Sequence, residues 1–90
     1  MNVFSVEGSS NGKTMITVTP QKTSAQSYKY IVSDTAIAMP DTDDVLTTGW
    51  TAWDGSAEIT AESGKYITVA TVTTADNKCV SAGSTIVRAK

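Results

Sequence analysis

Apolar and polar residues alternate along several short stretches of this chain, and this two-residue period predicts strands with one buried face. The clearest stretch is 27–33, where Tyr28, Tyr30 and Val32 share one face of the predicted strand. Residues 66–73 are almost all β-forming, which predicts a central and largely buried strand. Further short strands are predicted at 3–6, 14–19 and 57–60, and residues 79–82 and 84–89 are predicted to form one last strand. Residues 35–39 are predicted to continue the strand 27–33 or to form a return strand, and residues 45–53 to form a strand or an extended ribbon.

Turn-forming residues separate these stretches at intervals of roughly 8–12 residues, a spacing typical of a two-sheet sandwich. Asn11-Gly12 supplies the positive φ angles that a tight reversal needs, and Asp54-Gly55 marks another reversal. Gly83 interrupts the last strand and predicts a bulge or a bend there. No helical stretch of Ala, Leu, Glu, Lys and Arg occurs. The sequence therefore predicts an all-β protein, a single immunoglobulin-like (fibronectin III-like) antiparallel β-sandwich of about seven strands over residues 1–90.

Composition narrows the class of protein further. Ninety residues make at most one domain, and 40% of them are hydrophobic and 18% charged. The net charge is −2 and the seven Lys and Arg residues are scattered singly, so nucleic-acid binding is not expected. No apolar run approaches the roughly 20 residues of a membrane span, and no membrane partner is expected. Residues 1–5 do not resemble a signal peptide, and a single cysteine cannot form an internal disulfide.

Catalytic chemistry is not indicated. The chain has no histidine, which excludes Ser-His-Asp and Cys-His systems. Cys79 lies in an apolar strand and is expected to be buried and inert. Glu58 and Glu62 are separated by a turn, and nothing in the pattern builds a cleft around them. We therefore expect no enzyme activity, no catalytic residues and no cofactor.

Acidic residues cluster at Asp41, Asp43 and Asp44 and resemble a fragment of a calcium loop. The distal Glu and central Gly of such a loop are missing at the right spacing, so a solvated turn is predicted and no metal is expected. Three further aspartates sit beside turns, where an Asp side chain can bond the backbone two residues on. These are Asp34, Asp54 and Asp76.

Both tryptophans, Trp50 and Trp53, lie between Gly49 and Gly55. Residues three apart on a strand point to opposite faces, so one Trp is expected in the core and the other exposed. An exposed Trp is a candidate for stacking on a sugar ring or for contacting a partner protein. Tyr28 and Tyr30 are expected to pack in the core with their hydroxyls at the rim, and they become ligand contacts only if exposed beside a Trp. Trp50, Trp53, Tyr28 and Tyr30 are the candidate binding residues.

Segments of the sequence resemble two known families. Residues 59–69, where Gly64 is followed by Tyr66 at the start of a strand, resemble a fibronectin type III domain. Residues 28–30, 49–59, 67–70 and 75–83 are similar to the carboxy-terminal modules of phage head fibre proteins and related virion accessory proteins. This second resemblance leaves out the first 26 residues, which are then an added strand, an attachment arm or a domain boundary.

The phage resemblance implies a non-enzymatic module on the virion surface, of head fibre or capsid decoration type, made in the host cytoplasm. Its expected role is display, docking or weak host-surface adhesion. Its expected partners are other virion proteins or a host cell-surface glycan. Two alternatives stay open: a carbohydrate-binding module that uses exposed Trp and Tyr, and a passive spacer domain of a bacterial surface protein. The exposure of Trp50 and Trp53 separates the two readings of the aromatic residues, as core packing or as a binding surface.

Overall fold

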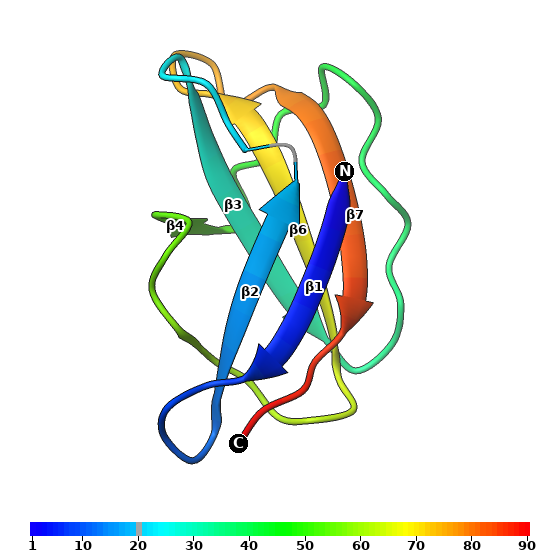
Figure 1. Ribbon diagram of the computed structural model, residues 1–90. Helices are drawn as coiled ribbons and strands as arrows, with labels where there is room; N and C mark the ends of the chain where they lie inside the picture. Colours follow the sequence, from blue (N-terminus) through cyan, green and yellow to red (C-terminus); the bar gives the residue numbers. More distant parts are fainter. Residues whose placement is uncertain (20) are drawn as a thin grey trace.

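The computed structural model describes residues 1–19 and 21–90, and in this part of the chain seven strands form two antiparallel sheets (Figure 1). One sheet has the order β1-β2-β5 and the other the order β4-β3-β6-β7. The predicted all-β sandwich is confirmed, whereas its immunoglobulin-like assignment stays a prediction. The strands are β1 (Asn2–Glu7), β2 (Lys13–Thr19), β3 (Gln26–Ser33), β4 (Thr51–Trp53), β5 (Ile59–Thr60), β6 (Tyr66–Thr73) and β7 (Cys79–Ile86).

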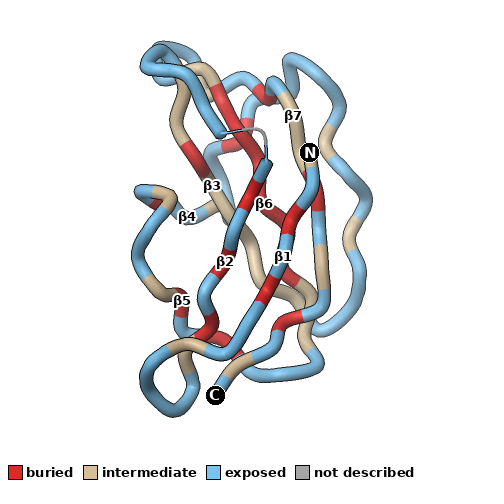
Figure 2. The backbone as a smooth tube through the Cα atoms, in the orientation of Figure 1, coloured by how far each residue is buried: buried red, intermediate tan, exposed pale blue. Residues whose placement is uncertain are grey.

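The main core lies between the two sheets, and alternation along the strands creates it. Ile16 and Val18 of β2 point inward, while their neighbours Met15, Thr17 and Thr19 are exposed. Figure 2 shows the buried positions of β1, β2 and β6 along the interior of the sandwich. This alternation is the two-residue period seen in the sequence. The buried residues of this core are Val3, Ile16, Val18, Tyr28, Trp53, Ile59, Ala61, Ile67, Val69 and Val87.

The outer face of the four-stranded sheet is also covered. Strand β6 is buried at every position but its two ends, as its near-continuous run of β-forming residues predicted. A second cluster forms on this outer face, where Leu46 from the long β3–β4 connection packs with Ala70, Val72 and Cys79. The connection wraps round the β7 side of the sandwich before it reaches β4 (Figure 1). The sheet thus has apolar contacts on both faces.

This connection corrects two strand predictions. Residues 35–39, predicted as a strand, pair with no strand among the described residues. Of the predicted strand 45–53, only Thr51–Trp53 forms one, and Val45 makes an isolated bridge to Lys78. Apolar composition alone does not make a strand, because the backbone also needs a partner for its hydrogen bonds. Here the backbone bonds go to the β6–β7 turn and the start of β7: Asp43 N–H to the Cys79 carbonyl at 2.8 Å, Leu46 N–H to Asn77 at 2.9 Å and Cys79 N–H to Asp44 at 2.7 Å.

Gly83 does not form the predicted bulge or bend. The irregularity in β7 lies earlier, because Thr71 pairs with Ser81 and Val72 with Cys79, which leaves Val80 as the extra residue. At Gly83 the start of the chain crosses β7 closely. A Cβ atom there would lie 2.7 Å from the Met1 carbonyl oxygen and 2.9 Å from Cγ2 of Val3. The absence of a side chain therefore permits close packing of β1 on β7, and the predicted bulge at Gly83 is wrong.

Hydrogen bonds through the buried hydroxyl groups of Ser5 and Thr14 join β1 and β2 to the backbone of Arg88, after β7. The Arg88 N–H donates to Ser5 Oγ at 2.8 Å, and Ser5 Oγ lies 2.6 Å from Thr14 Oγ1. Thr14 Oγ1 donates to the Val6 carbonyl at 3.0 Å. Because the Thr14 proton is used there, Ser5 is the donor to Thr14. Each buried hydroxyl is thus satisfied, which avoids the cost of an unpaired polar group.

The last residues of the chain are tied to both sheets. The Gly12 N–H donates to the Lys90 carbonyl at 2.9 Å, and the Lys90 N–H donates to the Lys13 carbonyl at 3.0 Å. Ala89 N–H donates to Ser63 Oγ at 2.8 Å, beside the start of β6. The C-terminus is therefore fixed at the lower end of the sandwich, whereas the N-terminus lies in its upper half beside β7 (Figure 1).

Candidate functional site

Tyr28 and Trp53 form the aromatic centre of the region that the sequence singled out. They face each other across β3 and β4, with ring centroids 5.3 Å apart and ring planes tilted by 45°. The Trp53 Nε1–H donates to the Ala57 carbonyl at 2.8 Å, and the Tyr28 hydroxyl accepts a bond from the Lys22 N–H at 3.0 Å. Both polar atoms are thus used to fasten neighbouring loops. This pair packs the core and holds the segments around it.

Trp50 lies on the other face of the four-stranded sheet. It is half-buried and packs against the second cluster of buried residues. The prediction that one Trp belongs to the core is confirmed by Trp53, but Trp50 is not fully exposed. The reason is the β3–β4 connection, which covers this face. The continuous burial of β6 was the sequence signal that such a cover exists.

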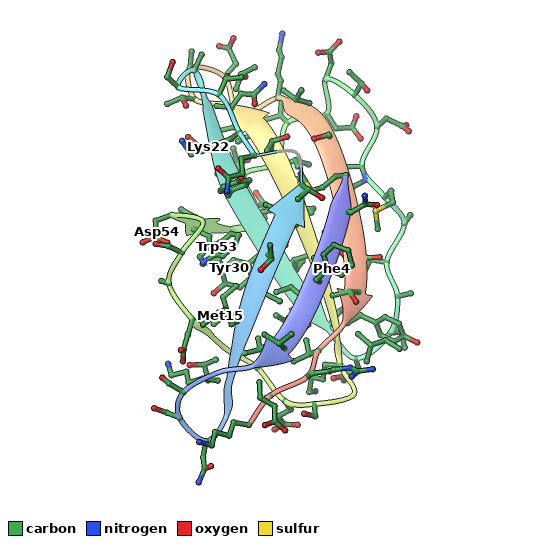
Figure 3. The ribbon with its side chains drawn as sticks, in the orientation of Figure 1. Phe4, Met15, Lys22, Tyr30, Trp53 and Asp54 are labelled. Atoms are coloured by element: carbon green, nitrogen blue, oxygen red, sulfur yellow. The ribbon has the colours of Figure 1, made fainter. Side chains whose placement is uncertain are left out.

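Tyr30 follows Tyr28 on the inner face of β3, as the period predicted, and it is half-buried against the main core (Figure 3). The structure therefore brings Tyr28, Tyr30 and Trp53 to one side of the sheet and places Trp50 on the opposite side. The four candidate residues do not form one aromatic platform. Their role as binding residues stays a prediction.

Two shallow grooves flank the turn after β4. One, of about 530 Å³, is lined by Lys29, Ala52, Asp54 and Asn77 together with Tyr28 and Trp53. Only 5% of Tyr28 and 9% of Trp53 is exposed, so neither offers an open ring face for stacking. The other groove, of about 230 Å³, is lined by Gln21, Lys22, Tyr28, Asp54, Gly55 and Ser56.

Asp54 is the best-defined polar group of this region (Figure 3). Its Oδ1 accepts bonds from the backbone N–H groups of Ser56 and Ala57, both at 2.8 Å. These bonds, first that from Ala57 and then that from Ser56, hold the pKa of Asp54 below its usual value. The predicted backbone contact is thus confirmed for Asp54. It is wrong for Asp34, which pairs with the Lys65 side chain, and the described residues show no such bond for Asp76.

The turn at Asp54 gives a testable pH dependence. Because its pKa is lowered in the folded state, the carboxylate stabilises the fold above the unfolded value of about 3.9, and this contribution is lost as the pH falls through the folded value. We expect Asp54→Asn to reduce the loss of stability on acidification. The thermal midpoint of both proteins, measured between about pH 5 and pH 2, checks this. An unchanged acid dependence in the variant would contradict the assignment.

Groups with catalytic or metal-binding potential are not gathered at this region. Cys79 is almost fully buried, and burial raises the pKa of its thiol, as expected for an inert packing residue. The acidic turn is exposed, and the Asp41 N–H donates to Asp44 Oδ2 at 2.9 Å. Residues 1–19 and 21–90 contain no group of three metal-ligating side chains, and they contain no helix long and apolar enough to cross a bilayer. What the region provides is a packed aromatic pair and an ordered turn.

Comparison with known proteins decides the family. Residues 6–89 match the family model described as the S-layer protein SbsC C-terminal domain. The chain belongs to this family. It is similar to the structure of surface layer protein SbsC, domains 4–9, with 27% identity and a TM-score of 0.78 over 98% of this chain. It is also similar to the crystal structure of the S-layer protein SbsC, domains 7, 8 and 9, with 26% identity and a TM-score of 0.75 over 98% of this chain.

This chain spans 14% of the first of these structures and 27% of the second. Among curated proteins no sequence matches it. The family match nevertheless covers nearly the whole sandwich, including all of β2 to β7 and the last two residues of β1. The chain is therefore a module of a bacterial surface protein family.

The predicted resemblance to phage head fibre and capsid decoration modules is wrong, because the family match and both similar structures are bacterial S-layer proteins. The predicted virion location is wrong for the same reason, since an S-layer domain implies the bacterial cell surface. The blocks 49–59 and 75–83 that suggested the phage family contain β4, a core Trp and hairpin turns. Such blocks recur in β-sandwiches and carry packing information, not function. The first 26 residues, which the resemblance omitted, supply β1 and β2.

Proposed function

We propose that this chain is a non-enzymatic structural spacer within a bacterial surface-layer protein, one of several modules joined in series. The observation that carries the proposal is the family match over residues 6–89. The similar structures are named as sets of several numbered domains, and this chain corresponds to a small part of each. A β-sandwich module in such a chain acts through its shape and its connections.

The shape of the sandwich supports this role. Its principal extents are 35 × 26 × 20 Å, and the two termini lie toward opposite ends of its length (Figure 1). A chain that enters near one end and leaves at the other adds length with each module. Both faces of the four-stranded sheet carry apolar clusters, and the buried hydroxyls of the described residues are all bonded. These features favour a stiff body over a deformable one.

Small-angle scattering of one copy and of two copies joined directly tests the spacer role. We expect the greatest dimension to increase by roughly one module length, 35 Å, on going from one to two copies. A pair that folds back and shows little increase would contradict the proposal.

Tryptophan fluorescence separates this proposal from the carbohydrate-binding alternative. A spacer is expected to show no saturable change when soluble cell-wall polysaccharide is added. A saturable change that is lost in Trp50→Phe would favour the alternative, because Trp50 is half-buried whereas Trp53 is in the core. The spacer role would then be incomplete as a description of the module.

A further inference from the structure

The first and last strands, β1 and β7, lie side by side and run in the same direction. A Cβ atom on Gly83 would lie 2.9 Å from Cγ2 of Val3. Further along the contact, the Arg88 N–H donates to Ser5 Oγ at 2.8 Å. Residue numbers thus increase together on both sides. Because β1 and β7 belong to different sheets, this contact joins the two sheets along one side of the sandwich (Figure 1).

Both strands run along the length of the sandwich (Figure 1). The N-terminus lies in the upper half, where β1 begins, and the C-terminus lies at the lower end, beyond the end of β7. A pull on the two ends of the chain therefore draws β1 upward and β7 downward, each along its own length. The two strands are driven past each other, and neither is lifted off the sandwich.

Pulling in this direction loads the hydrogen bonds of both strands in shear. Strand β1 pairs with β2 along its whole length, and β7 pairs with β6, both in the antiparallel sense. The bonds of an antiparallel pair lie perpendicular to the strands. When a strand is pulled lengthwise, these bonds share the force and must break together, whereas a strand peeled from one end loses them one after another. The sandwich is thus pulled in the direction in which its strands resist most.

Residues 87–90, the tail, add attachments at the point where a pull on the C-terminus enters the protein. Val87 belongs to the main core, is only 1% exposed, and its N–H donates to the Lys65 carbonyl at 2.7 Å. The backbone N–H and C=O of Lys90 are bonded to Lys13 and Gly12. The pull therefore acts on bonds to both sheets before it acts on β7.

We propose that this module bears tensile load along the chain, and that the contact of β1 with β7 and the tail is the structure that resists it. The inference rests on the proposed function in one respect, since modules joined in series pass a pull from each to the next. Resistance matters for a spacer because an unfolded module no longer sets a distance. Stretched out, 90 residues would span about 300 Å, compared with 35 Å for the folded sandwich.

Single-molecule force measurement tests the role by pulling the same protein in two directions. Handles at the two termini load the strands in shear, whereas handles at the N-terminus and at Thr19→Cys peel β1 from one end. Thr19 is suited to this because it is exposed and lies directly opposite Asn2. Cys79 is almost fully buried and is not expected to react with the handle. We expect unfolding at a lower force in the peeling direction. Equal forces in the two directions, or a lower force between the termini, would overturn the proposal.

Ser5→Ala tests the contact itself, because it removes the hydroxyl that bonds the Arg88 N–H. Under a constant pull between the termini, unfolding is expected to be about fivefold faster, the effect of one hydrogen bond that breaks on the way to the unfolded state. Ser27→Ala is the matched control: it removes a hydroxyl that lies 2.8 Å from Thr74 Oγ1, outside β1, β7 and the tail. The control is expected to unfold at the natural rate. An unchanged rate in Ser5→Ala, or equal acceleration in both variants, would overturn the role of this contact.

Failure of this inference can be told apart from failure of the spacer role. Scattering of joined copies measures length in the absence of force. An extended pair whose modules unfold at equal force in both directions would be a spacer without resistance to load. A pair that folds back would remove the spacer role, whatever force a single module withstands.

Discussion

Replacing Trp53 by alanine is expected to lower the free energy of unfolding by about 3–5 kcal/mol. The side chain is buried, packs against the Tyr28 ring and donates a hydrogen bond to the Ala57 carbonyl. The variant loses the packing and leaves a cavity between the sheets, and the freed carbonyl adds to the cost. Urea denaturation followed by circular dichroism measures the loss. Because native domains have a total of about 5–15 kcal/mol, the variant is expected to be close to unfolding at room temperature.

Phe4→Ala is the control for this experiment, since it also truncates an aromatic side chain but on the surface. Phe4 is mostly exposed, so its loss is expected to cost less than about 1 kcal/mol. Equal losses in the two variants would mean that Trp53 does not hold the core together.

Gly55→Ala is expected to lower the free energy of unfolding by about 2–4 kcal/mol, through two separate effects. Gly55 has a φ of +91°, a conformation that a side chain strains. A Cβ atom there would also lie 2.7 Å from Cε2 of Tyr28. The Tyr28 ring cannot easily move away, because it is buried against Trp53. Thermal or urea unfolding measures the sum of both effects.

Gly64→Ala separates the two effects. Gly64 has nearly the same φ, +92°, but a Cβ atom there would meet no atom within 4 Å beyond its own chain neighbours. Its replacement is therefore expected to cost only the backbone strain, about 1 kcal/mol. If Gly55→Ala cost no more than Gly64→Ala, the close contact with Tyr28 would contribute nothing to the stability.

The sequence pattern predicted those features of the fold that neighbouring residues determine. The period of Tyr28, Tyr30 and Val32 placed these side chains on one face of β3, and the continuous run of β6 indicated burial on both faces. Asp54 was correctly expected to bond its own turn. Each of these features is determined by residues within a few positions of one another, which is the range over which a sequence pattern carries information.

Features that depend on distant partners were missed. The bridge from Val45 to Lys78 and the packing of Leu46 in one cluster with residues of β6 and β7 join residues far apart in the chain, and no local period encodes them. Gly83 was misread because its reason is the close passage of Met1, at the other end of the chain. The partial burial of Trp50 followed from the same connection that carries Leu46. The phage resemblance failed because a sandwich core and its turns are shared by proteins of unrelated function.

The anchoring of Lys90 has a consequence for whatever follows it in a longer polypeptide. Its N–H and C=O are both bonded to the start of β2 and the turn before it, so the backbone departs from a fixed position and with a fixed heading. A flexible linker would let the next folded unit take many orientations. A segment that starts from a residue held by hydrogen bonds, as Lys90 is, has fewer directions available to it. In such a polypeptide, hydrogen bonds inside this sandwich would partly set the angle between it and the next folded unit.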